Sequence, residues 1–148
     1  MLIEKEYIYI DAALRTEKEA MEFIGEKALY YNITNDKNRV IEDLFDRELE
    51  FCTNLGMGLS IPHTKSQAIN KPAVFFIRYK DEIEWGNESK VKASVVFLSP
   101  KNSVDNIHLK MLSNVSRKLV HDEFREVLLY TGDKEEIYRG LSDALNNI

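Results

Sequence analysis

The chain has 148 residues, of which 44% are hydrophobic and 30% are charged, as is typical of a soluble globular protein. This length is enough to bury one full core, so we expect residues 1–148 to form a single domain. The formal net charge of −5 provides no basic surplus to neutralise phosphates, which argues against nucleic acid as a partner.

Signals for export or for membrane insertion are weak in this sequence. Glu4 and Glu6 stand where a secretory signal needs an apolar run. No uninterrupted apolar segment reaches the roughly 20 residues that span a bilayer. The single cysteine, Cys52, rules out an internal disulfide and fits a reducing compartment. We therefore expect a cytoplasmic protein.

The first third of the chain predicts one strand and two helices. Residues 7–10 are β-branched and aromatic, which is typical of a short strand. A capping-box pattern at residues 16–19 begins a helix that ends near Tyr31. A second helix is predicted over residues 35–51, and Leu49 is part of its apolar stripe.

The middle of the chain predicts three strands. The first covers residues 57–61 and is stopped by Pro62. Residues 73–79 and 93–98 show no polar alternation, which indicates strands buried on both faces. The segment between them, residues 81–90, predicts a polar loop.

The last third predicts helices. Asp105 is the expected cap of a helix that carries His108 on its buried face. Asp122 is the expected cap of a short helix, with Gly132 as its C′ residue, and residues 133–136 form a capping box for the final helix. Helices before and after a block of two-sided strands predict an α/β fold, a three-layer α/β/α sandwich in which helices cover both faces of a small sheet.

The histidines are the first candidates for chemistry. His63 follows an apolar strand and Pro62, so we expect its side chain near a strand end, where sites in covered sheets tend to lie. His108 needs a polar partner on its apolar helix face, and it could meet His63 across the sheet end. Each could instead be a structural imidazole, bonded in the core or exposed at the surface. His121, beside Asp122, is expected to be a solvated cap residue.

Arg47 is the candidate for a fixed positive charge. It lies on the second predicted helix, just before the glycine-rich stretch that leads to His63. If it turns toward His63 it can bind an anion. The alternative is a surface ion pair with Asp43 or Glu50.

Short hydroxyl side chains flank His63 in the sequence. Ser60 and Thr64 could each orient an imidazole nitrogen or bond a phosphoryl oxygen, or they could serve ordinary turn chemistry. They do not form the nucleophile elbow of hydrolases. Cys52 falls on an apolar helix stripe, which indicates packing. Three histidines without close-spaced ligands argue against a metal site.

Four sequence blocks follow one another in a characteristic order. They are Arg47-Glu48, then Gly56-x-Gly58-Leu59-Ser60-Ile61-Pro62-His63, then Glu84-Trp85-Gly86, and then His108-Leu109 with Leu112. In these blocks the chain resembles, over essentially its whole length, the fructose/mannitol-type IIA component of the bacterial phosphoenolpyruvate-dependent sugar phosphotransferase system. That family usually has alanine in place of Ser60 and a small residue in place of Thr64, and neither difference removes a chemical role.

The resemblance implies a mixed sheet and a phosphotransferase that works through a phosphohistidine. A phosphoryl group would pass from the phosphocarrier HPr to His63 and then to a cysteine of the EIIB component, and a sugar would be phosphorylated as it enters. In this mechanism His108 and Arg47 are the candidates to stabilise the phosphoryl group, and Thr64, by its hydroxyl beside His63, has a possible part in orientation. It implies no cofactor and no metal, and contact with the membrane only through the EIIC permease.

Two other functions fit the same residues. A regulatory EIIA-like protein of the nitrogen type would carry phosphate on His63 but act by phosphorylation-dependent binding to a regulator. A non-catalytic interaction domain with a core histidine would leave His63 unphosphorylated. The transport phosphocarrier is the function we expect first.

Overall fold

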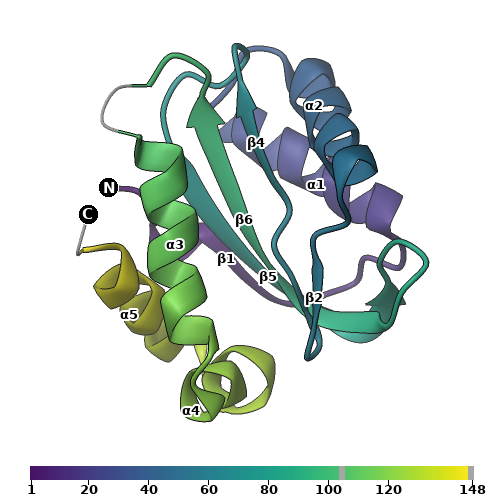
Figure 1. Ribbon diagram of the computed structural model, residues 1–148, viewed down its shortest axis with the longest axis vertical. Coiled ribbons are helices and arrows are strands. Elements are labelled where there is room, and N and C mark those ends of the chain that lie inside the picture. The colour runs from purple at the N-terminus through teal and green to yellow at the C-terminus, as the bar shows by residue number, and fades with distance from the viewer. Residues whose placement is uncertain (104–105, 147–148) are drawn as a thin grey trace.

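A mixed sheet forms the middle layer of the protein (Figure 1). The computed structural model describes residues 1–103 and 106–146, and six strands occur in these ranges. They are β1 (Ile8–Ala12), β2 (Asn54–Gly56), β3 (Leu59–Ser60), β4 (His63–Ser66), β5 (Ala73–Glu84) and β6 (Lys90–Pro100). This confirms the predicted strands near residues 8, 73 and 93, the last two being longer than expected.

Helices cover both faces of the sheet, which confirms the predicted α/β sandwich (Figure 1). One face carries α1 (Glu17–Tyr30) and α2 (Lys37–Glu50). The other carries α3 (Ile107–Leu119), α4 (Asp122–Glu126) and α5 (Lys134–Leu145). The short turns are η1 (Lys5–Tyr7) and η2 (Val127–Thr131), the second a π-helix. Within the described ranges, no helix is both long and apolar enough to cross a membrane.

The centre of the sheet is the antiparallel pair β5 and β6, in which Phe75 lies opposite Val96. The strand order is β1-β5-β6-β3-β2, and β4 also pairs with β6. Both β3 and β4 run parallel to β6. Because both faces of β5 and β6 are covered, their middle residues are buried regardless of which way they point, as the unbroken apolar pattern predicted.

The predicted polar loop over residues 81–90 is wrong in half of its length, because only residues 85–89 lie outside the strands. β5 continues through Glu84 and pairs with the start of β6, where Ile83 lies opposite Val91. Trp85 is wholly buried, although polar residues surround it in the sequence. Ile83 and Trp85 alternate with polar neighbours, and this alternation marks a strand with one buried face.

The predicted single strand over residues 57–61 is also wrong. This stretch is a hairpin of β2 and β3, whose turn has φ values of 75° at Gly56, 56° at Met57 and 79° at Gly58. Glycine adopts this left-handed region without strain, so the two glycines make the sharp reversal possible. Pro62 then separates β3 from β4. His63 therefore follows the end of β3 across Ile61 and Pro62, as predicted, and is also the first residue of β4.

Two helix starts agree with the predicted caps. The Thr16 hydroxyl accepts a hydrogen bond from the Glu19 amide at 3.0 Å, but the Glu19 carboxylate accepts from the Arg15 amide rather than closing the box on Thr16. At α5 the capping box between Asp133 and Glu136 is complete. Asp36 caps α2, which starts slightly later than predicted.

The caps around α4 differ from the prediction. His121, exposed as expected, is the N-cap residue, and Asp122 is the first residue of the helix. Gly132 has a φ of −74°, so it is not a left-handed C′ residue. A Cβ there would lie 2.5 Å from the Val127 carbonyl oxygen, so close packing is what requires glycine. The predicted cap Asp105 lies outside the described residues.

Candidate active site

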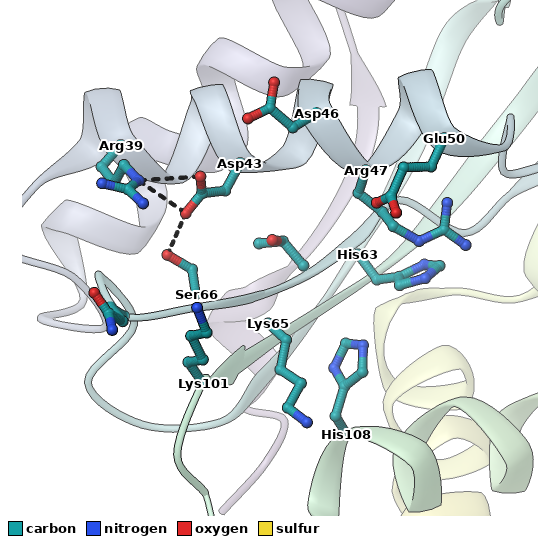
Figure 2. A pocket seen from close by; sticks show the side chains of 12 residues that line it. Arg39, Asp43, Asp46, Arg47, Glu50, His63, Lys65, Ser66, Lys101 and His108 are labelled. Atoms are coloured by element: carbon teal, nitrogen blue, oxygen red, sulfur yellow. Dashed lines mark hydrogen bonds and ion pairs between the residues drawn. The ribbon is translucent and has the colours of Figure 1, made fainter.

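A pocket of about 320 Å³ lies between α2, β4 and the start of α3 (Figure 2). Its lining is highly charged, since α2 contributes both arginines and carboxylates, and two lysines come from β4 and the segment after β6. The lining residues are Arg39, Asp43, Asp46, Arg47, Glu50, His63, Thr64, Lys65, Ser66, Gln67, Lys101 and His108. All four residues that the sequence singled out as a site lie in this pocket.

His63 is the first residue of β4 and lies opposite Phe97 of β6. Its side chain is buried, and its Nδ1 lies 2.7 Å from the Ile61 carbonyl oxygen. A carbonyl oxygen only accepts hydrogen bonds, so Nδ1 carries the ring proton in this contact. In the neutral ring, Nε2 therefore keeps its lone pair.

The Ile61 carbonyl is held in place by a chain of hydrogen bonds from α2. The amide of Ile61 donates to the Thr53 carbonyl at 3.0 Å. Thr53 in turn donates its amide and its hydroxyl to the Glu48 carboxylate, the amide at 3.0 Å. The helix that carries Arg47 thus also anchors the loop that fixes the His63 ring.

His108 lies in the first turn of α3, and its ring centroid is 5.5 Å from that of His63. Its Nδ1 lies 2.8 Å from the hydroxyl of Ser99, a wholly buried residue near the end of β6. Figure 2 shows the His108 ring extending toward His63. The structure therefore brings together the two histidines that the sequence singled out, and it supplies the polar partner that His108 was expected to need.

Arg47 lies in the last turn of α2, with its guanidinium beside the His63 ring (Figure 2). Its Nη1 donates to the Phe51 carbonyl at 2.9 Å. Within residues 1–103 and 106–146 it forms no ion pair, because Asp43 pairs with Arg39 instead. The alternative of a surface ion pair for Arg47 is therefore wrong.

The two hydroxyls that flank His63 in the sequence have different surroundings. Thr64 lies opposite Leu98 in β4, and its mostly buried side chain lines the pocket. Ser60 is wholly buried, and its hydroxyl lies 2.6 Å from that of Ser94. Ser60 therefore belongs to the core and does not serve the pocket.

Burial sets the protonation of both histidines. It lowers the pKa of the His63 imidazole below its ordinary 6.5. The positive charge of Arg47 also lowers this pKa, whereas the hydrogen bond to the Ile61 carbonyl and the charge of Glu48 raise it by less. Burial also lowers the pKa of His108 to about 4, with further contributions from the charges of His63, Lys65 and Arg47. Both rings are therefore neutral at pH 7.

Several residues around the histidines were not found from the sequence. Ser99 and Thr53 form hydrogen bonds that depend on tertiary pairing, which the sequence pattern does not show. Lys65 and Lys101 line the pocket and add positive charge. Lys65 follows His63 by two residues, and residues at this spacing on a strand lie on the same face. This spacing is the sequence signal from which Lys65 could have been predicted beside His63.

Known proteins have similar sequences and folds. The family model for "Phosphoenolpyruvate-dependent sugar phosphotransferase system, EIIA 2" matches residues 1–144. The fructose-specific EIIA component of Haloferax volcanii is 31% identical over 142 residues, which are 95% of this chain and 92% of that protein. Multiphosphoryl transfer protein 1 of Escherichia coli is 29% identical over 144 residues, which are 97% of this chain but 17% of that much longer protein.

Solved structures agree with the sequence relatives. The nitrogen regulatory protein IIA-Ntr of Neisseria meningitidis aligns with a TM-score of 0.84 and 25% identity, covering 95% of this chain and 96% of that one. Mannitol enzyme IIA of Escherichia coli, solved in complex with phosphorylated enzyme IIB, aligns with a TM-score of 0.80 and 21% identity. The alignment covers 96% of this chain and 99% of that one. The chain belongs to the EIIA type 2 family of the phosphoenolpyruvate-dependent sugar phosphotransferase system.

Proposed function

We propose that this protein is a sugar phosphotransferase system phosphocarrier, which accepts a phosphoryl group from phospho-HPr on Nε2 of His63 and passes it to the EIIB component. The observation that carries the proposal is the 2.7 Å contact between Nδ1 of His63 and the Ile61 carbonyl oxygen. It leaves Nε2 as the nucleophilic atom in a pocket whose lining includes Arg47 and Lys65. Such a carrier would work in the cytoplasm as a single domain and meet the membrane only through the EIIC permease.

The transfer needs a neutral imidazole and no cofactor. The Nε2 lone pair forms the new N–P bond, while the bond from phosphorus to the donor nitrogen breaks and its electron pair leaves with the donor. The ring proton stays on Nδ1 of His63, where the Ile61 carbonyl stabilises the positive charge that the ring gains. Transfer to an EIIB cysteine is the same displacement, with a thiolate as the attacking group.

Arg47 and His108 are suited to stabilise the phosphoryl group. Phosphoryl transfer depends mainly on positioning and on charge stabilisation of the equatorial oxygens. The Arg47 guanidinium supplies a fixed positive charge beside His63, and Lys65 adds a second cation to the pocket. The neutral His108 can donate one N–H hydrogen bond. Thr64 lines the pocket and can contribute a hydroxyl.

Exposed apolar side chains close in sequence to Arg47 and His108, here called the apolar rim, fit docking of protein partners. Leu49 and Phe51, which follow Arg47 closely, are 84% and 76% exposed, and Leu109, next to His108, is 65% exposed. The sequence predicted Leu49 in the buried stripe of α2, so its exposure is a correction that favours a contact surface. HPr and EIIB would use this rim in turn. The mannitol relative solved with phosphorylated enzyme IIB supports such a partner.

Phosphorylation by phosphoenolpyruvate, enzyme I and HPr tests the proposal. We expect acid-labile labelling of the wild-type protein and of His121→Ala, in which the exposed N-cap residue of α4 is changed. His63→Ala is expected to stay unlabelled, and NMR of the labelled protein should place the phosphorus on Nε2 of His63. If active phospho-HPr does not label the wild-type protein, both functions that need a phosphohistidine are excluded, and a non-catalytic interaction domain is the remaining function.

The likeness to a nitrogen regulatory protein favours a second function for the same phosphohistidine. That protein aligns over 95% of this chain with a TM-score of 0.84. A regulatory EIIA would bind a regulator in one phosphorylation state only. Transfer of the label from phospho-His63 to a purified EIIB cysteine would support transport. Stable retention of the label in the presence of active EIIB would support regulation.

A further inference from the structure

Ser99 contacts the Nδ1 atom of the His108 ring. Its hydroxyl oxygen lies 2.8 Å from Nδ1 of His108, and Ser99 is wholly buried near the end of β6. Phe97, two residues earlier on the same strand, pairs with His63, so β6 supports both rings. A hydroxyl can donate or accept, so this contact is compatible with either tautomer of His108.

The geometry of the two rings distinguishes these tautomers. His63 keeps its proton on Nδ1 because of the Ile61 carbonyl, so its Nε2 presents a lone pair. If Ser99 accepted a proton from Nδ1 of His108, then His108 would present a lone pair on Nε2 as well. Two lone pairs on facing rings, with centroids 5.5 Å apart, leave the pocket without an N–H donor from either histidine.

We infer that Ser99 is a positioning residue whose hydroxyl donates to Nδ1 of His108 and so places the His108 proton on Nε2. The two histidines then hold opposite tautomers, the nucleophile as Nδ1–H and its neighbour as Nε2–H. In this arrangement His108 donates a hydrogen bond to a phosphoryl group on His63. This last step rests on the proposed function, whereas the tautomer assignment rests on the buried Ser99 hydroxyl and on the facing of the two rings.

The protonation of His108 makes its tautomer matter. Burial lowers the pKa of His108 to about 4, so at neutral pH the ring carries a single proton. An imidazole free in water exchanges this proton between both nitrogens. A buried hydroxyl donor at 2.8 Å from Nδ1 favours one form, since the other would need the hydroxyl to find a different acceptor.

Proton-coupled ¹⁵N NMR of the histidine rings tests the assignment without any partner protein. At pH 8 we expect His108 in the wild-type protein to be almost entirely in the Nε2–H form. Ser99→Ala should convert it to a mixture of tautomers, and Ser99→Thr, which keeps the hydroxyl, should restore the single form. A wild-type His108 in the Nδ1–H form, or an unchanged ring in Ser99→Ala, would overturn the inference.

Ser94→Ala is the matched control. Ser94 lies on the same strand and is also wholly buried, but its hydroxyl contacts those of Ser60 and Tyr79 and no histidine. The same substitution there should leave the His108 tautomer unchanged even if it lowers stability. A tautomer mixture in both variants would mean that general loosening of the core moves the ring, which would also overturn the inference.

Single-turnover transfer from phospho-HPr connects the tautomer to the reaction. Loss of one well-placed hydrogen bond should slow transfer to Ser99→Ala by about five- to tenfold, with recovery in Ser99→Thr. Labelling at the wild-type rate in Ser99→Ala would overturn the role of Ser99 and leave the proposed function intact. Failure of phospho-HPr to label the wild-type protein would overturn the proposed function, and with it this role in transfer.

Discussion

The imidazole rings of His63 and His108 lie with their centroids 5.5 Å apart, and each uses its Nδ1 for a contact with another residue. His63 is tied to the Ile61 carbonyl, and His108 is tied to the Ser99 hydroxyl. Only the two Nε2 atoms remain for the pocket. In the proposed function, this division of the ring nitrogens gives His63 the part of nucleophile and His108 that of a neutral hydrogen-bond donor, and it leads to predictions about charge, rate and stability.

The His63 ring should titrate below pH 6.5. Its burial and the charge of Arg47 both lower the pKa of the imidazole, so the neutral nucleophile persists into mildly acidic solution. Arg47→Ala removes one of these causes and should raise the His63 pKa. NMR titration of the ring carbon–proton signals in both proteins measures the two midpoints. A wild-type midpoint at or above that of the urea-unfolded chain would contradict the prediction.

Arg47→Ala should slow phosphoryl transfer by about 10²–10³-fold, the usual effect of removing one charge-stabilising donor. Arg47→Lys keeps the charge but loses the planar donor fork, so we expect an intermediate rate. Rapid-quench single-turnover labelling with phospho-HPr gives the rate constants. Arg39→Ala is the control, because Arg39 lies on the same helix and lines the same pocket but pairs with Asp43. Equal losses in Arg39→Ala and Arg47→Ala would show that Arg47 has no special part.

The sequence pattern predicted the layers of the fold well because burial leaves a local trace. Two-sided strands such as residues 73–79 consist of unbroken apolar residues, and α5 repeats its buried residues at helical spacing. The hairpin before His63 left no such trace. Its residues are apolar like those of a strand, and only the positive φ angles at Gly56, Met57 and Gly58 turn the chain back on itself.

The candidate site was predictable in its residue types and not in its contacts. His63, His108 and Arg47 are unusual where they stand in the sequence, so they could be singled out from it. Their partners could not, because Ile61 contributes only a backbone carbonyl and Ser99 meets His108 only after β6 and α3 have packed. The sequence of an apolar strand does not indicate which buried group will form a hydrogen bond with a serine in it.

Ser94→Ala should destabilise the protein more than Ser60→Ala. The Ser94 hydroxyl lies 2.6 Å from that of Ser60 and 2.8 Å from that of Tyr79, and all three residues are wholly buried. Removing the central hydroxyl leaves two buried groups without this partner, at roughly 1–3 kcal/mol each, whereas Ser60→Ala leaves the bond between Ser94 and Tyr79. Urea unfolding at pH 7.5 gives the free energies.

The control for this prediction is Ser116→Ala on the exposed side of α3. Because an exposed helical serine makes no buried hydrogen bond, its replacement should change the free energy of unfolding by no more than about 0.5 kcal/mol. A Ser60→Ala variant as unstable as Ser94→Ala would mean that the hydroxyl chain acts as one unit. Its end would then matter as much as its centre, contrary to the prediction.

The protein should lose stability as the pH falls below 6.5, in part because of His108. Burial lowers the pKa of His108 to about 4 in the folded protein, while the unfolded chain keeps the ordinary value of 6.5. Between these two values the unfolded state binds more protons, so the free energy of unfolding rises with pH across this window and is constant above it. At pH 5 the loss from His108 alone amounts to at most about 2 kcal/mol. His63, whose pKa is also lowered, acts in the same direction.

Comparison of the wild-type protein with His108→Asn isolates this effect from the titration of the carboxylates. Asparagine is polar and does not titrate, so the difference in free energy of unfolding between pH 8 and pH 5 should be smaller in the variant than in the wild type. Urea unfolding at both pH values, with equal slopes as the check on two-state behaviour, provides the four free energies. Parallel pH dependence in the two proteins would mean that His108 accepts a proton in the folded state as readily as in the unfolded chain. The neutral donor of the proposed function would then be absent in mild acid.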